Sequence, residues 1–209
     1  MPEPISIQLP AAAPERLILL FHGVGSTPES MVPLGDMLAS AFPTAAVLSV
    51  PSPDPCDMGA GRQWFSVLGI TEANRSFRVA ATLPRFVATI KALQARTGVH
   101  ASRTVTIGFS QGAIMSLEAS QLDEPPAAVV VALSGRFARL PERAAPSTSI
   151  HLVHGDADPV IAVGNAQAGA ATLHRLGAAV TLDVVPGLAH GIDERVARRV
   201  VDLVGGVSS

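Results

Sequence analysis

Six short apolar runs, several of them rich in β-branched residues, recur along this chain of 209 residues. Most are continuous rather than alternating, as expected for strands that are buried on both faces of a parallel sheet. Helix-like stretches separate them, so strand and helix alternate and the sequence predicts an α/β fold. The predicted strands are Arg16–Phe21, Ala45–Val50, Arg103–Phe109, Ala127–Leu133, Ser149–His154 and Ala179–Val185.

The remaining segments complete a three-layer sandwich, a mainly parallel sheet with helices on both faces. Ile5–Leu9 alternates between apolar and polar residues and predicts an added edge strand. Pro51–Gly61 is the longest irregular stretch, and a loop of that length is often functional. The predicted helices span Pro28–Ala41, Asn74–Thr97, Gln111–Gln121, Val163–Leu176 and His190–Val204.

Composition excludes several classes of protein. Hydrophobic residues make up 48% of the chain and charged residues 15%, which excludes a disordered chain and allows a large core. No repeat or low-complexity linker divides the sequence, so we expect one domain over residues 1–209.

The net charge of -2, without a dense Lys/Arg cluster, argues against nucleic-acid binding. No apolar run reaches the ~20 residues of a membrane span, and no signal-like stretch opens the chain, so we expect a cytoplasmic protein.

A serine between two glycines follows the third predicted strand. Gly108-Phe-Ser110-Gln-Gly112 fits the G-x-S-x-G pattern of a nucleophile elbow, a strained turn between a strand and a helix. Such a turn leaves no room for side chains two residues to either side of the serine. The alternative is an ordinary strand-to-helix turn in which Ser110 caps the helix. The β-branched strand before the motif and the helix formers after it favour the elbow.

A serine hydroxyl is a weak nucleophile at neutral pH and needs a positioned base, together with a carboxylate that orients this base. In an α/β hydrolase the acid and then the histidine follow the serine. His190 lies in a loop after the final predicted strand and therefore fits the base. His151 and His154 lie within or at the end of a strand and precede the expected acid, and His174 lies in a predicted helix.

We expect the acid in the loop after the penultimate strand, because catalytic groups gather at the carboxyl ends of parallel strands. Asp156 and Asp158 both lie there, in a His-Gly-Asp-Ala-Asp-Pro segment, and spacing does not decide between them. Asp183 also fits the order but lies within the last predicted strand.

The tetrahedral intermediate of acyl transfer needs two backbone N–H groups aimed at its negative oxygen. One is expected from Gln111, the residue after the nucleophile, at the amino end of its helix. The other is expected from the loop His22–Ser26 after the first main strand. Gly23-Val-Gly25 lacks the third glycine of a dinucleotide-binding loop and no P-loop pattern occurs, so nucleotide binding is disfavoured.

With these motifs in order, the chain resembles the phospholipase/carboxylesterase family of α/β hydrolases, which includes small bacterial carboxylesterases and acyl-protein thioesterases. The resemblance runs from about Leu17 to the C-terminal helix. It implies the α/β-hydrolase fold, Ser110 as nucleophile and His190 as base. It also implies Asp158, rather than Asp156, as the acid.

The same resemblance assigns the rest of the site. It places the two oxyanion N–H groups on Val24 and Gln111. Trp64 and Phe65 match a Trp-Phe segment beside the family's cleft, where they would bind the acyl chain, although Trp64 fits a core anchor equally well. Ser26 departs from the family, because many relatives have an acidic residue there.

The sequence therefore predicts a carboxylic-ester hydrolase that forms an acyl-enzyme and needs no metal or organic cofactor. No large insertion provides a lid, so we expect an open or shallow cleft and small or short-to-medium acyl esters as substrates. An acyl thioesterase or lysophospholipase with the same triad is the alternative among enzymes. A non-catalytic scaffold that binds a ligand or partner is the alternative from another class. The resemblance also raises the possibility of a homodimer.

Overall fold

The computed structural model describes residues 2–144 and 147–206. Its centre is a seven-stranded sheet in the order β1-β3-β2-β6-β7-β8-β9, in which six strands are parallel and correspond to the six predicted ones. These strands are β2 (Arg16–Phe21), β3 (Ala45–Val50), β6 (Thr104–Phe109), β7 (Val129–Leu133), β8 (Ser149–Gly155) and β9 (Val180–Val185).

The added edge strand is also present. β1 (Ile5–Gln8) pairs antiparallel with β3 at one edge of the sheet. The Gln8 side chain anchors this pairing, because its Nε2 donates to the carbonyls of Phe42 and Ala45 at 2.9 and 2.8 Å.

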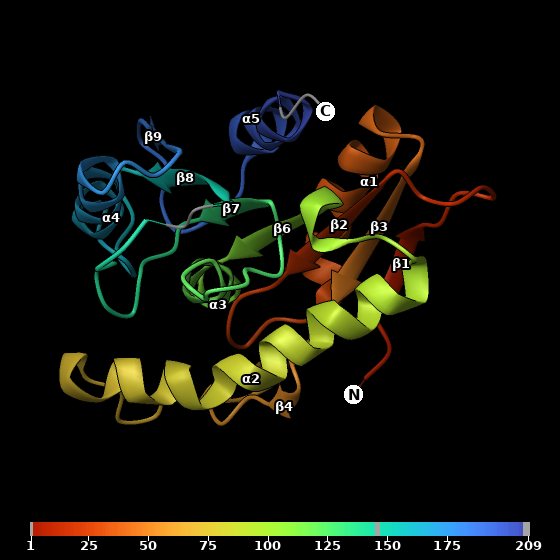
Figure 1. Ribbon diagram of the computed structural model, residues 1–209. Helices are drawn as coiled ribbons and strands as arrows, with labels where there is room; N and C mark the ends of the chain where they lie inside the picture. Colours follow the sequence, from red (N-terminus) through yellow and green to blue (C-terminus); the bar gives the residue numbers. More distant parts are fainter. Residues whose placement is uncertain (1, 145–146, 207–209) are drawn as a thin grey trace.

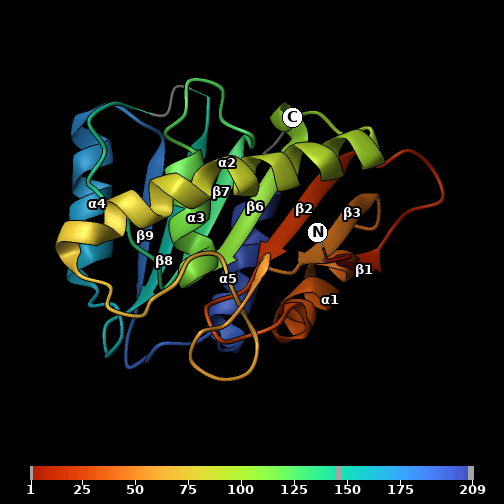
Figure 2. The ribbon, with the colours of Figure 1, turned by 90° about the horizontal axis from the view of Figure 1, so that it is seen from below.

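Helices cover both faces of the sheet and make the predicted three layers (Figure 1, Figure 2). One face packs against α1 and α5, and the other against α2, α3 and α4. Two short 3₁₀ helices, η1 (Pro28–Met31) and η2 (Ala101–Arg103), precede α1 and β6. The longer helices are α1 (Val32–Ala41), α2 (Glu72–Thr97), α3 (Gln111–Ala119), α4 (Gly164–Arg175) and α5 (Glu194–Gly205).

The central strand β2 shows why the predicted strands read as continuous apolar runs. Ile18 and Leu20 pack with the α1 and α5 side chains, whereas Leu17, Leu19 and Phe21 pack with those of α2 and α3. All five side chains are fully buried. Each contributes about 1.5–3 kcal/mol by leaving water, so both faces of the strand favour apolar residues.

Two expectations need correction. The last helix begins at Glu194 rather than at His190, because the Asp193 carboxylate accepts the N–H of Val196 at 3.0 Å and caps the helix there. The stretch Pro51–Gly61 is not wholly irregular, since β4 (Asp54–Pro55) pairs with β5 (Arg62–Gln63) in a small hairpin. None of the helices in the described ranges has the length and apolar character of a membrane span.

The packing of α2 can be tested with two phenylalanines on the same helix. Phe86 is fully buried against the rings of Phe21 and Trp64, with centroid distances of 4.6 and 4.8 Å, whereas Phe77 is 77% exposed. We expect Phe86→Ala to lower the free energy of unfolding by about 3–5 kcal/mol, because it leaves a cavity. Phe77→Ala should change it by no more than about 0.5 kcal/mol. Urea denaturation followed by circular dichroism measures both, and equal losses would contradict this packing.

Candidate active site

Ser110 lies on a strained turn between β6 and α3. Its backbone angles are φ 52° and ψ -110°, a conformation that is uncommon for any residue other than glycine and costs about 1–3 kcal/mol. Its N–H donates to the carbonyl of Leu133 at 2.9 Å, which ties the turn to the end of β7. The Ser110 side chain does not cap α3, so the alternative of an ordinary capping serine is wrong.

The glycines of the motif permit the close approach that this turn requires. A Cβ atom on Gly108 would lie 2.4 Å from the backbone of Gly112 and Ala113. A Cβ atom on Gly112 would lie 2.3 Å from the carbonyl oxygen of Phe21 on the neighbouring strand β2. Both distances are far shorter than a van der Waals contact, which confirms the reason given for glycine at these two positions.

The loops after β8 and β9 bring an acid and a base together. The Nδ1 atom of His190 lies 2.7 Å from Oδ2 of Asp158. Because a carboxylate oxygen only accepts, Nδ1 carries the proton and Nε2 is left with a lone pair, which is the tautomer that a general base needs. The His190 ring also packs on the ring of Phe109, the residue before Ser110, at a centroid distance of 4.9 Å. The base therefore lies beside the elbow.

Within residues 2–144 and 147–206, the Ser110 hydroxyl forms no hydrogen bond. In enzymes without bound substrate, the hydrogen bond between the nucleophile and its general base is often long, and it shortens only in the complex with substrate.

The Asp158 carboxylate is fully buried and accepts several hydrogen bonds. Its Oδ1 accepts the N–H groups of Val160 and Ile161 at 2.8 and 3.0 Å. Burial alone would raise the pKa of Asp158, but these two bonds and the bond from His190 outweigh it and hold the pKa below its usual value.

The other two candidate acids have different positions. Asp156 accepts the N–H of Gly187 at 2.7 Å, so it ties the loop after β8 to the loop that carries His190. Asp183 forms an ion pair of 3.0 Å with Arg199 of α5. Of the three carboxylates, Asp158 is the one in contact with His190.

His154 is a part of this site that sequence reasoning set aside. Its buried ring places Nε2 at 2.7 Å from the carbonyl oxygen of Ile161 and at 3.2 Å from Oδ2 of Asp158. Since both neighbours are acceptors, Nε2 carries a proton and a second imidazole faces the carboxylate. The feature of the sequence that could have indicated this role is the position of His154 directly before the Gly-Asp-Ala-Asp segment.

The loop after β2 passes directly beside the nucleophile. A Cβ atom on Gly23 would lie 3.2 Å from Cβ of Ser110, so a side chain there would require its neighbours to shift by a few tenths of an ångström. Val24 follows Gly23 directly, and Gln111 is the first residue of α3. The two residues with the predicted oxyanion N–H groups therefore flank Ser110.

The Gln111 side chain makes contacts that the sequence did not reveal. Its Oε1 accepts the N–H of Trp64 and its Nε2 donates to the carbonyl of Phe65, both at 2.7 Å. The Trp64 ring is 1% exposed and meets Phe21 edge to face at a centroid distance of 6.0 Å. Phe65 is buried in the same apolar cluster. The burial of Trp64 fits the core-anchor alternative, and binding of the acyl chain by Trp64 and Phe65 stays a prediction.

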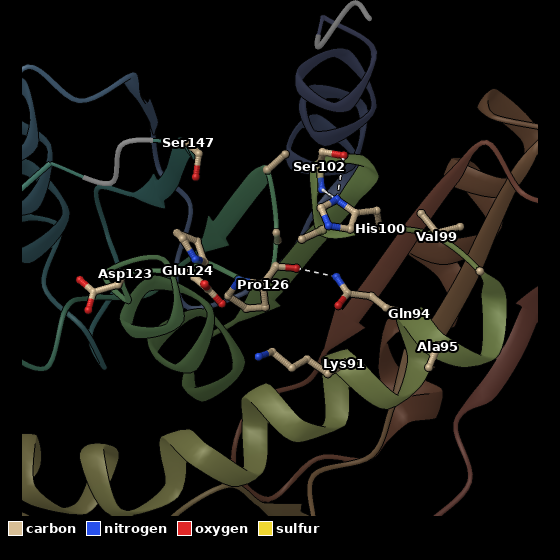
Figure 3. A pocket seen from close by; sticks show the side chains of 15 residues that line it. Lys91, Gln94, Ala95, Val99, His100, Ser102, Asp123, Glu124, Pro126 and Ser147 are labelled. Carbon is tan, nitrogen blue, oxygen red and sulfur yellow. Dashed lines mark hydrogen bonds between the residues drawn. The ribbon is translucent and has the colours of Figure 1, made fainter.

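A cavity of about 900 Å³ lies at the end of the sheet opposite to Ser110. Figure 3 shows the side chains that line it. The cavity lies near the beginnings of β6 and β7, whereas Ser110 follows the end of β6. Its lining includes Lys91, Gln94 and Asp123 but none of the predicted site residues. Over the described ranges, no group of three His, Cys, Asp or Glu side chains has the arrangement of a metal site.

Comparison with known proteins identifies the family. The model of the phospholipase/carboxylesterase family matches residues 3–204. The chain belongs to this family. Esterase YpfH of Escherichia coli (strain K12) is 47% identical to the chain over 196 residues, which cover 94% of this chain and 84% of that protein.

Solved structures agree with this placement. Esterase PE8 superposes with a TM-score of 0.84 at 26% identity, over 96% of this chain and 97% of that one. The Bacillus cereus carboxylesterase superposes with a TM-score of 0.80 over 95% of this chain and 92% of that one, and at 18% identity it supports the fold alone. The α/β-hydrolase fold and the enzyme class predicted from the sequence are confirmed: the chain is a hydrolase of carboxylic esters.

The lowered pKa of Asp158 makes stability depend on pH in a defined direction. A carboxylate whose pKa is lowered in the folded state stabilises that state above the pKa of the unfolded chain. This stabilisation is lost as the pH falls through the lower, folded value. We therefore expect Asp158→Asn to be less stable than the parent by a constant amount at neutral pH, and the difference to narrow below about pH 4.

Urea titrations of both proteins between pH 3 and pH 7 measure this difference. A difference that stays constant down to pH 3, or that widens there, would contradict the lowered pKa.

Proposed function

We propose that this esterase acts as a serine carboxylesterase, with Ser110 as nucleophile, His190 as base and Asp158 as the orienting acid. The observation that carries the proposal is the 2.7 Å contact between His190 Nδ1 and Asp158 Oδ2, formed beside a serine on a strained elbow. We further propose that residues 1–209 act as one catalytic domain. The cytoplasmic location and the homodimer stay predictions.

In the acylation step, Nε2 of His190 removes the proton of the Ser110 hydroxyl as Oγ bonds to the acyl carbon. The carbonyl oxygen becomes negative and accepts the N–H groups of Val24 and Gln111. The intermediate collapses when His190 passes its proton to the leaving oxygen, which departs as the alcohol. Asp158 stays ionised throughout and stabilises the imidazolium that forms in between.

In the deacylation step, His190 takes a proton from water, and the resulting hydroxide attacks the acyl-enzyme carbonyl. The second tetrahedral intermediate uses the same two N–H groups of Val24 and Gln111. Its collapse returns the proton to Oγ of Ser110 and releases the carboxylic acid. The cycle needs only water and the ester, and His190 serves as base and acid in turn.

Small or short-to-medium acyl esters are the proposed substrates. The strands and longer helices of the described residues form the three layers, and the extra elements after β3 form only a small two-stranded hairpin. We expect a shallow cleft, because no described helix is left over to cover the elbow as a lid. Thioesters and lysophospholipids are the alternative substrates for the same groups, and substrate panels separate them.

Replacement of Ser110 tests the proposed nucleophile. Ser110→Ala should lower kcat for p-nitrophenyl butyrate by at least about 10³-fold, since no oxygen remains to form the acyl-enzyme. Ser116→Ala is the matched control, because Ser116 is a buried serine of α3 whose hydroxyl donates to the carbonyl of Gly112 at 2.9 Å. The control should keep the parent kcat. Turnover in Ser110→Ala equal to that of Ser116→Ala would exclude Ser110 as the nucleophile.

A series of p-nitrophenyl esters from acetate to decanoate, with the matching thioesters, tests the proposed substrate range. Each methylene that the protein buries contributes about 0.8 kcal/mol, or roughly fourfold in kcat/KM. We expect this gain for the first additions and a plateau or decline for the long chains, because a shallow cleft leaves their ends in water. A steady rise through decanoate would instead indicate a deep acyl pocket.

A further inference from the structure

His22 is a buried group of the loop after β2 that the proposed mechanism does not use. Its ring is 1% exposed. Its Nδ1 lies 2.7 Å from the carbonyl oxygen of Gly23, the next residue in the chain. Its Nε2 lies 3.1 Å from the backbone nitrogen of Ser52 and 3.2 Å from the Ser52 hydroxyl, thirty residues away in the sequence.

The chemistry of these neighbours fixes the protonation of the ring. A carbonyl oxygen only accepts hydrogen bonds, so Nδ1 carries a proton and donates it to Gly23. A backbone N–H only donates, so Nε2 carries a lone pair and accepts from Ser52. Burial, the largest influence, lowers the pKa of His22 and keeps the ring neutral. His22 therefore links Ser52 to Gly23 in one direction, N–H to ring to carbonyl.

The carbonyl that His22 holds belongs to the same peptide group as the N–H of Val24. A trans peptide is planar, and its C=O and N–H point in opposite directions. A bond that fixes the Gly23 carbonyl therefore fixes the direction of the Val24 N–H on the side of the loop that passes Ser110. We propose that His22 is a positioning residue that aims the Val24 N–H at the oxyanion, an inference that rests on the proposed function of Ser110 and Val24.

The segment that begins at Ser52 also contacts the loop His22–Ser26, which we call the oxyanion loop, through Arg62 at its far end. The N–H of Gly25 donates to the carbonyl of Arg62, and the N–H of Arg62 donates to the carbonyl of Ser26, both at 2.9 Å. The Arg62 guanidinium turns back and donates to the Ser52 carbonyl. A Cβ atom on Gly61 would lie 2.3 Å from the Gly25 oxygen, so the two loops are in direct contact.

These contacts give the long stretch after β3 a role in the reaction. Ser52 and Arg62, at the two ends of this stretch, hold the loop His22–Ser26 at two places, and the His22 side chain connects Ser52 to that loop. A misplaced N–H donor costs rate only in the transition state, because the substrate carbonyl carries little charge before attack. Loss of His22 should therefore lower kcat more than it raises KM.

Two amide variants test this role, because asparagine and glutamine place the same group at different distances from the backbone. His22→Asn brings its amide near the position of Nδ1, so it can still donate to the Gly23 carbonyl. His22→Gln brings its amide near the position of Nε2, so it reaches Ser52 and leaves the Gly23 carbonyl with only the longer bond from the Ser26 N–H, at 3.3 Å. We expect the glutamine variant to lose about 10–100-fold in kcat for p-nitrophenyl butyrate, with KM within about threefold of the parent.

The asparagine variant should keep kcat within about threefold of the parent. A trifluoromethyl ketone, which forms a tetrahedral adduct with the serine, provides a second measurement. Its affinity should fall in His22→Gln by the same factor as kcat and stay close to the parent value in His22→Asn, whereas a purely structural role would affect both variants alike. Thermal unfolding followed by circular dichroism is recorded for each variant.

The outcomes separate this inference from the proposed function. If Ser110→Ala abolishes turnover and the two amide variants have equal kcat values, the positioning role of His22 is overturned and the proposed function stands. If turnover persists in Ser110→Ala, the proposed function fails and the inference fails with it. A selective loss in the glutamine variant, shared by kcat and ketone affinity, supports the inference.

Discussion

The backbone of Ser110 is the constraint on which the rest of the active site depends. With φ at 52° and ψ at -110°, the chain leaves β6 and enters α3 without an intervening loop. Gly112 then lies against the carbonyl of Phe21, so the start of α3 is fixed to the end of β2 as well as to β6. The strain persists because the buried sheet and helix on either side over-determine the turn.

The parallel sheet explains why distant segments reach the Ser110 hydroxyl. Parallel strands place all their carboxyl ends at one edge, so the loops after β2, β8 and β9 emerge beside the turn after β6 (Figure 2). The loops after β8 and β9 are also joined to each other, because Ala157 donates to the Leu188 carbonyl at 3.1 Å and Asp156 accepts from Gly187. This pairing carries His190 to Asp158. A buried carboxylate without such donors would cost several kcal/mol, and Asp158 has two backbone N–H groups besides the ring of His190.

Most of the fold was predictable from the sequence because each parallel strand is buried on both faces and leaves a continuous apolar run. The positions of Ser110, the acidic loop and His190 were predictable because each follows a predicted strand, and the carboxyl ends of parallel strands lie at one edge. The hairpin of β4 and β5 was not, since strands of two residues have no periodicity. The start of α5 was misplaced because the cap at Asp193 is a local hydrogen bond rather than a change in the apolar pattern.

The hydrogen-bond partners of the side chains within the site could not be predicted from the sequence. Gln111 is bonded to Trp64 and Phe65, more than forty residues away, and His22 to Ser52, thirty residues away. Such pairings depend on how a loop folds back across the sheet edge, and no spacing encodes that. The position of Trp64 illustrates the same limit, because an aromatic residue near a cleft and one in the core have the same appearance in a sequence.

The central claim is that the hydroxyl of Ser110 attacks the acyl carbonyl. Mass spectrometry of the protein after reaction with a fluorophosphonate tests it most directly, because the reagent forms a stable covalent adduct with an activated serine. The expected result is one phosphonyl group per chain, located on Ser110 and absent from the His190→Ala variant. An adduct on another residue, or none in a preparation that hydrolyses esters, would contradict the claim.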